Sequence, residues 1–444
     1  MAEKNIIELT PFRADLTRAL VRRAERLLAA TDLADEVAAL EPLEAYYIIR
    51  EIGLDQALSV ILHLSPEQLG ACVDLDCWHR YDFALESFAE WLTAFSLDGP
   101  ETLASTFFSL DYVVQLLFLS QSVIVYDADT DEVPQEKKGR ESSRAMTPDG
   151  FYLLELKTSR SLRIHPFTVL DALYQYDLPA THQLLSEVRV GLPTEIEEEA
   201  LHFRNGRMQD LGFASPDEAA VLFSRPDVRQ PQTRPKKPLD SVLTRIPSIY
   251  AVPLSETTLL QRALSLITDQ EFLSSLEQEI VWTINSAIIA YGETVQDTSQ
   301  IADIAERVRD TLSLGLESLL AGPGAALPED DNEVAAKASD LLYVWHITDL
   351  FRHGFAATMG LRQEAGRALL EPGVQDWYNL PDADQSDEPD DRLARAFLTA
   401  LLGRHPLRSG FDLAKPEKTR AFCCLAEIDI ARLRLRQIIT RITC

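Results

Sequence analysis

Residues 91–111 read WLTAFSLDGPETLASTFFSLD and contain a helix start inside an apolar pattern. The start is residues 99–101, Gly-Pro-Glu: a permissive residue, then a proline with no N–H to satisfy, then an acid near the positive end of the helix dipole. Residues 65–67 (Ser-Pro-Glu) and 215–217 (Ser-Pro-Asp) repeat this arrangement. Because apolar residues at three- and four-residue spacing follow each start, the sequence predicts a mainly α-helical fold.

The same stretch has a counterpart further along the chain. Residues 91–111 match residues 207–227, RMQDLGFASPDEAAVLFSRPD, and residues 58–76 match residues 172–188 more loosely. Both pairs are offset by about 115 positions, which indicates a duplicated unit and a helical-repeat-like, superhelical arrangement. The alternative is that leucine, a proline–acid pair and alanine recur in any helical protein.

Two β-rich runs, residues 122–126 (SVIVY) and 151–156 (FYLLEL), interrupt the helical pattern. The polar stretch between them, residues 127–150, is too long for a tight turn, so we expect a two-stranded ribbon with an acidic loop. Prolines and bases gather in residues 225–247 and indicate a linker. The predicted organisation is an N-terminal helical-repeat-like unit (1–120), a small β ribbon with an acidic loop (121–157), a second helical unit (158–224), a proline-rich linker (225–253) and a C-terminal helical bundle (254–444).

Three further helices follow from apolar spacing. A buried stripe is predicted for one helix that carries Trp78, Tyr81, Leu85, Phe88 and Leu92. The other two are a helix over residues 335–370 and a last helix over residues 417–442. Arg432 lies in the apolar seam of the last helix, so we expect it to pair with an acid from a neighbouring helix. Residues 328–333 and 381–391 are acidic and predict solvated loops.

The charge of the chain excludes one large class of function. Its 444 residues include 70 acidic and 42 basic side chains, a formal net charge of −28. Such a chain repels phosphate backbones, so a nucleic-acid binder is not expected. A hydrophobic content of 46% is enough for large cores and excludes global disorder.

Several features predict a cytoplasmic location. The first residues, MAEKNIIELTPFRADL, contain no apolar signal region. The most apolar stretch, Leu103 to Tyr126, is interrupted by Asp111, Gln115 and Gln121, so we expect a buried helix and a strand there and no membrane span. The five cysteines are an odd number and do not form a secreted disulfide framework.

One segment carries a resemblance to a known family. Residues 197–213, EEEALHFRNGRMQDLGF, together with residues 58–76, resemble an uncharacterised bacterial family of domains of unknown function. The N-terminal helices are also faintly similar to the superhelical cytosolic domain of MgtE-type magnesium transporters. Neither resemblance implies an activity. They imply a mostly helical fold and a bacterial cytoplasmic setting.

The strongest candidate for chemistry is a metal site on the helix predicted over residues 335–370. His346, Asp349 and His353 stand at i, i+3 and i+7, so they project from one side of that helix. Two imidazoles and a carboxylate can hold a divalent metal if another helix adds a ligand. The alternative is a hydrogen-bonded polar seam with Arg352 beside Asp349. No other cofactor is expected.

A second candidate is an anion or partner site at Arg204 and Arg207, which flank Gly206. Glycine costs a helix about 1 kcal/mol relative to alanine, so its presence needs a reason, and close approach of another helix is the simpler one. The alternative is that the two guanidinium groups bind a carboxylate or phosphate of a ligand or partner.

We expect the cysteines to serve as packed side chains. Cys72 and Cys77 are too far apart in sequence for a zinc-ribbon pair. Cys423 and Cys424 are adjacent and cannot readily form a relaxed disulfide with each other.

The leading prediction for function is a cytoplasmic helical scaffold or adaptor that binds a protein partner through a concave helical surface. It rests on repeat-like helices without a catalytic signature: the sequence has no P-loop, Rossmann fingerprint, G-x-S-x-G or H-E-x-x-H motif. The alternative is a metal-binding protein or enzyme centred on His346, Asp349 and His353.

Overall fold

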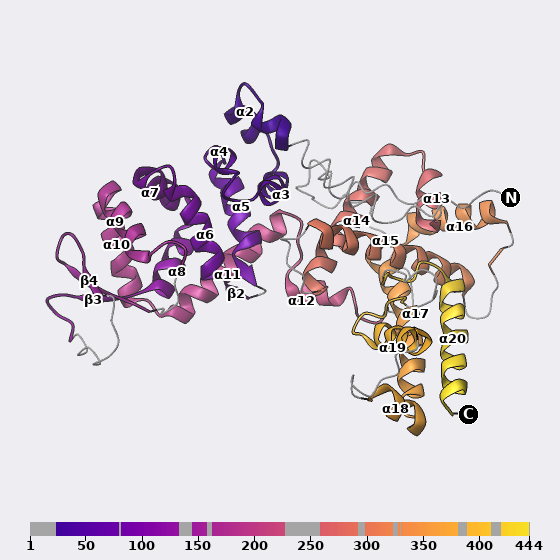
Figure 1. Ribbon diagram of the computed structural model, residues 1–444. Helices are drawn as coiled ribbons and strands as arrows, with labels where there is room; N and C mark the ends of the chain where they lie inside the picture. The colour runs from indigo at the N-terminus through magenta and orange to yellow at the C-terminus, as the bar shows by residue number, and fades with distance from the viewer. Residues whose placement is uncertain are drawn as a thin grey trace. The chain divides into compact units, whose positions relative to one another are not determined.

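The computed structural model shows a mainly α-helical protein with two small β-sheets (Figure 1), which confirms the predicted fold class. It describes residues 24–79, 81–132, 144–157, 162–226, 258–291, 298–322, 327–328, 330–380, 389–409 and 419–443. These fall into two compact units: unit 1 is formed by Met1–Ser215 and Thr294–Thr298, and unit 2 by Pro216–Glu293 and Ser299–Cys444. The helical-repeat arrangement stays a prediction.

Unit 1 contains most of the described β structure and a set of short helices. Its elements are α2 (Leu33–Ala38), α3 (Pro42–Ile52), α4 (Leu58–Ile61), α5 (Pro66–Asp76), β1 (Trp78–His79), β2 (Asp82–Phe83), α6 (Leu85–Ser96), α7 (Pro100–Ser109), α8 (Tyr112–Ser122), β3 (Val123–Asp127), β4 (Arg144–Met146), β5 (Tyr152–Leu156), α9 (Pro166–Tyr176), α10 (Leu178–Val190) and α11 (Pro193–Asp210).

The proline-led helix starts lie where the sequence predicts them. α5 begins at Pro66, and α7 begins at Pro100. Ser65 precedes α5 and completes a capping box: its hydroxyl accepts from the Gln68 N–H at 3.2 Å, and the Gln68 side chain accepts from the Ser65 N–H at 2.9 Å. In unit 2, α12 likewise begins at Pro216.

The predicted two-stranded ribbon is wrong in one respect, because the sheet has three antiparallel strands in the order β3-β5-β4. The additional strand β4 lies inside the stretch predicted as an acidic loop. It is an edge strand of three residues, too short to show an alternating pattern, and the Arg144 guanidinium contacts the Glu155 carboxylate of β5 at 2.6 Å. Residues 133–143 of the predicted loop lie outside the described residues.

A second correction concerns the helix predicted through Trp78 and Tyr81. The chain forms the antiparallel hairpin β1–β2 here, with Trp78 opposite Phe83, and α6 begins only at Leu85. The rings of Trp78 and Phe83 lie 5.3 Å apart across the hairpin, so a cross-strand aromatic pair replaces the expected helical stripe. Tyr81 is 51% exposed.

A buried carboxylate links three helices of unit 1. Asp76, at the end of α5, is 1% exposed and accepts from the Tyr46 hydroxyl of α3 at 3.2 Å and from the Trp91 indole N–H of α6 at 2.8 Å. The Arg50 guanidinium, also on α3, lies 3.3 Å from it. Because each donor is buried or half-buried, the carboxylate satisfies groups that would otherwise lack a partner.

Replacing Asp76 by alanine therefore tests the stability of unit 1. We expect the free energy of unfolding to fall by about 3–5 kcal/mol, because the donors of Tyr46 and Trp91 stay buried without this acceptor. Asp55→Ala is the control, since its pair with Arg163 is exposed, and it should cost less than about 1 kcal/mol. Urea unfolding followed by tryptophan fluorescence measures both, and equal losses would contradict the role of Asp76.

Unit 2 is built almost entirely of helices. They are α12 (Pro216–Val221), α13 (Leu259–Ser265), α14 (Gln270–Tyr291), α15 (Thr298–Ala321), α16 (Asp331–Val344), α17 (Ile347–Ala368), α18 (Pro372–Tyr378), α19 (Pro389–Leu402) and α20 (Leu425–Thr443). Of the predicted linker over residues 225–253, residues 227–253 lie outside the described residues. The same holds for residue 329 and residues 381–388 of the predicted acidic loops.

Helices α15 and α17 cross in backbone contact at a pair of glycines. A Cβ atom on Gly315 would lie 2.0 Å from the carbonyl oxygen of Leu350, and one on Gly354 would lie 2.0 Å from the carbonyl oxygen of Thr311. Real Cβ contacts essentially never fall under 3.0 Å. The two helices can therefore approach this closely only because neither crossing residue has a side chain.

Gly315→Ala should therefore lower the free energy of unfolding by about 3 kcal/mol or more, because a Cβ atom would force the two helix backbones apart. Gly360→Ala on α17 is the matched control: nothing lies within 4 Å of its added Cβ, so it should raise the stability by about 0.5–1 kcal/mol. Urea unfolding followed by circular dichroism compares the two. A Gly315→Ala variant as stable as the native protein would show that the crossing tolerates a side chain.

The apolar stretch before β3 folds as short buried helices. Nine of the eleven residues of α8 are buried, and β3 follows directly. Among the described helices, none is by itself long and apolar enough to cross a membrane, and the one pair that reaches this length and composition, α7 with α8, is bent by 118°.

Candidate functional site: adjacent cysteines at the start of α20

Among the described residues, the predicted metal ligands His346, Asp349 and His353 are not a group whose ligand atoms all lie within 4.8 Å of one another. The helix predicted over residues 335–370 is broken: α16 ends at Val344, and His346 is the cap residue before α17. This prediction of one continuous helix is wrong because the buried carboxylate of Glu279, on α14, accepts from the Ile347 N–H at 3.1 Å and so stabilises a new helix start.

Each predicted ligand has its own surroundings. His346 Nδ1 lies 3.9 Å from Glu279, and Asp349 accepts from Arg352 at 3.1 Å. The ring of His353 packs edge-on against Trp345, and burial lowers the pKa of His353. The Arg352 pairing that the alternative hypothesis expects is thus present.

The two arginines predicted as an anion site are engaged within unit 1. Arg207 binds the buried Asp74 of α5 through Nε at 2.6 Å and Nη2 at 3.0 Å, and it also contacts Asp111 at 2.7 Å. Arg204 is 8% exposed, donates to the Asp74 carbonyl at 3.0 Å and lies over the Trp78 ring. Both guanidinium groups therefore hold α11 against α5.

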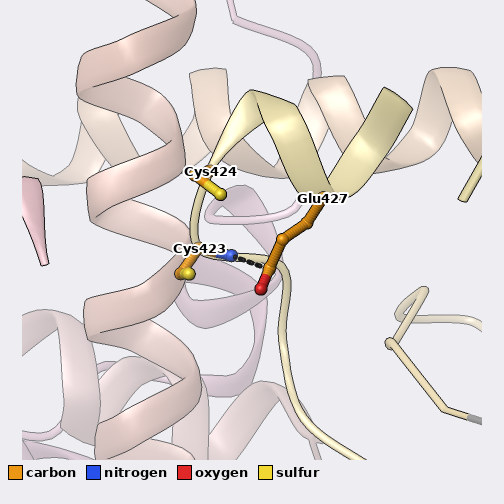
Figure 2. Close-up of side chains that lie close together, drawn as sticks. All are labelled: Cys423, Cys424 and Glu427. Atoms are coloured by element: carbon orange, nitrogen blue, oxygen red, sulfur yellow. Dashed lines mark hydrogen bonds between the residues drawn. The ribbon is translucent and has the colours of Figure 1, made fainter. Parts of the chain in front are cut away.

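A different group of side chains converges, and it includes the two adjacent cysteines. Among the described residues, one group of three or more His, Cys, Asp and Glu has its ligand atoms within 4.8 Å of one another: Cys423, Cys424 and Glu427. All three are partly exposed, and both cysteines are free thiols. Figure 2 shows the two sulfur atoms on either side of the bend where the chain enters α20, with Glu427 in the first turn of that helix.

The last helix begins at Leu425, after the bend, so the predicted start at residue 417 is wrong. Phe422, fully buried in the core cluster of unit 2, anchors the segment before it. The Glu427 carboxylate reaches back and accepts from the Cys423 N–H at 3.0 Å, so it satisfies a backbone donor in front of the helix. The expected pairing of Arg432 is confirmed, because it contacts Glu364 of α17 at 3.0 Å.

Two arginines fix the position of Glu427. Arg408 and Arg420 form an isolated antiparallel bridge, with N–H to carbonyl distances of 2.7 and 3.1 Å. Because the bridge places these two residues opposite each other, both guanidinium groups reach the same carboxylate. Both donate to Oε1 of Glu427, Arg408 at 2.7 Å. Such charge-assisted bonds orient the carboxylate.

Helix α15 supports the other side of the bend with two carboxylates. Glu317 accepts from the Leu425 N–H at 2.7 Å and so caps α20 from outside. Asp310 lies 3.7 Å from the guanidinium of Arg420. Gly315, the crossing residue of α15, lies between these two positions in sequence, so the same helix segment meets α17 and the cysteine bend.

The two thiols differ in acidity. The Cys423 thiol donates to the Cys424 sulfur and lowers the pKa of Cys424, and the Glu427 backbone N–H acts in the same direction. The pKa of Cys423 is raised, because its proton is held in that contact and because it is buried. Burial also raises the pKa of Asp310 and Glu317, so these acids hold their protons to higher pH than usual.

This arrangement is chemically suited to a soft metal ion. Thiolates are the ligands that zinc and monovalent copper prefer, and a zinc–sulfur distance of about 2.3 Å places two sulfurs on one tetrahedral ion about 3.8 Å apart. The sulfurs here lie within 4.8 Å, so a small side-chain rotation suffices. The arginines hold the Glu427 carboxylate in place beside the two sulfurs.

One sequence pattern points to this site, although the cysteines were expected only to pack. Cys424 and Glu427 have the spacing of a capping box, S/T-x-x-E, with a cysteine at the cap. The other contributors, Arg408, Asp310 and Glu317, are distant in sequence, and no pattern links them to the cysteines.

Comparison with known proteins gives a family without a known activity. Residues 7–442 match a family of unknown function, DUF6178. The chain belongs to this family. The DUF6178 match covers nearly the whole chain and confirms the predicted resemblance to a family of domains of unknown function. No curated protein and no solved structure matches the chain, and the similarity to the MgtE-type domain stays a prediction.

The difference in acidity leads to a prediction about alkylation. In the native protein at neutral pH, iodoacetamide should react with Cys424 before Cys423, because the thiolate is the nucleophile. Cys72 and Cys77, which are 0% exposed and whose pKa values burial raises, should not react. Mass spectrometry of peptides after timed alkylation measures the order. Faster reaction at Cys423 would contradict the assigned hydrogen-bond direction.

Proposed function

We propose that the protein binds a thiophilic metal ion at the bend before α20, through the thiols of Cys423 and Cys424 beside Glu427. The observation that carries the proposal is the convergence of two thiols and a carboxylate within 4.8 Å at one partly exposed bend. The bend is held by contacts from three directions: the buried Phe422, the arginine bridge, and Glu317 of α15. A donor set held in this way needs little rearrangement to take a metal.

The cysteine group replaces His346, Asp349 and His353 as the proposed metal site. His346 caps α17 while Asp349 and His353 lie within it, and among the described residues only the cysteine group has its ligand atoms within 4.8 Å of one another. Cysteine sulfur also binds soft ions more strongly than an imidazole–carboxylate set does.

A cytoplasmic location suits this function and is proposed with it. The cysteines in the described part of the chain are free thiols, and free thiols persist in reducing compartments. The role of a helical scaffold that binds a protein partner stays a prediction, which neither the fold nor the family tests.

Cadmium titration of the reduced protein tests the proposal. We expect one equivalent of Cd²⁺ to saturate the thiolate-to-cadmium charge-transfer absorption. Cys423→Ser and Cys424→Ser should each weaken binding by about 100-fold or more, because each removes a direct ligand and loss of outer contacts alone costs 10–100-fold.

The matched control is Cys72→Ser, which removes a buried thiol of α5 outside the cysteine group and should leave the affinity unchanged. Circular dichroism of each variant separates loss of binding from loss of fold. Equal cadmium affinity in the native protein and both site variants would overturn the proposal.

A further inference from the structure

The charges around Glu427 limit the kind of ion that the cysteine group can take. We infer that the site binds a thiophilic ion of low coordination number, with monovalent copper as its representative, through Cys423 and Cys424 alone. Glu427 then acts as a positioning residue. This inference rests on the proposed metal-binding function and names the class of ion.

The first argument is that the Glu427 carboxylate is already occupied. Its Oε1 accepts from Arg408 and Arg420, and its Oε2 accepts from the Cys423 N–H at 3.0 Å and from Arg420 at 3.5 Å. Two guanidinium groups occupy the lone pairs of Oε1, and their positive charges repel a metal cation at that oxygen. To become a metal ligand, Glu427 would have to give up contacts that hold the bend in place.

The second argument is the number of remaining donors. Within the described residues, no fourth His, Cys, Asp or Glu joins the group at 4.8 Å. A structural zinc site requires four ligands, usually nitrogen and sulfur, and calcium requires six to eight oxygens. Two thiolates with an already occupied carboxylate meet neither requirement.

The third argument is that the two sulfurs themselves are well placed for a soft ion. They come from consecutive residues, so no chain segment must be ordered to bring them together. Both thiols are partly exposed, so an ion can reach them from solvent. Monovalent copper favours thiolate ligands and does not need a tetrahedral or octahedral set, so two sulfurs can bind it.

Competition titrations with chromophoric chelators test the inference on the whole chain, without oxygen. We expect one Cu⁺ per chain, bound at least about 100-fold more tightly than Zn²⁺. Glu427→Gln should change the Cu⁺ affinity by less than about 3-fold while it weakens Zn²⁺ by about 10-fold or more, since zinc has to recruit the carboxylate.

X-ray absorption of the Cu⁺-loaded native protein gives a second reading that does not depend on any variant. A shell of sulfur neighbours only is the expected result. An oxygen neighbour, tighter binding of Zn²⁺, or an equal loss of both ions in Glu427→Gln would overturn the inference and leave the metal site standing. Failure of Cd²⁺, Zn²⁺ and Cu⁺ alike to bind would overturn the proposed function as well.

Discussion

The close crossing of α15 and α17 is the constraint on which unit 2 depends. At Gly315 and Gly354, each backbone occupies the space that a Cβ atom of the other helix would need. Fixing these two helices also fixes Asp310 and Glu317, which lie on either side of Gly315 along α15 and contact the bend before α20. The glycine crossing therefore positions the two α15 carboxylates that contact the segment around the cysteine bend, in addition to the contacts that Phe422 and the arginine bridge make.

Unit 1 uses a different device, a central helix held by two buried carboxylates. Asp74 and Asp76 are two residues apart on α5 and so point to opposite sides of that helix. Asp74 binds Arg207 of α11, while Asp76 binds donors on α3 and α6. Such buried groups are costly unless fully paired, and here each carboxylate has several donors. Arg207 is thereby explained as a structural residue.

The sequence was sufficient for features that are encoded locally. The helix starts at Pro66, Pro100 and Pro216 follow from a cap, a proline and an acid in consecutive positions, and the helical class follows from apolar spacing. Strand β4 could not be seen, because three residues show no alternation and its pairing with β5 is a tertiary contact. The break at His346 depends on Glu279, which lies 68 residues away in sequence. The candidate site could not be predicted for the same reason, because Glu317, which caps Leu425, lies 108 residues away in sequence.

The central claim is that Cys423 and Cys424 together hold a metal ion at the start of α20. Anomalous X-ray diffraction from crystals of the full chain grown with cadmium locates such an ion directly. The account predicts an anomalous peak within bonding distance of both sulfur atoms. A peak elsewhere, for example beside His346 and Asp349, or no peak at the cysteines of fully reduced protein would contradict it.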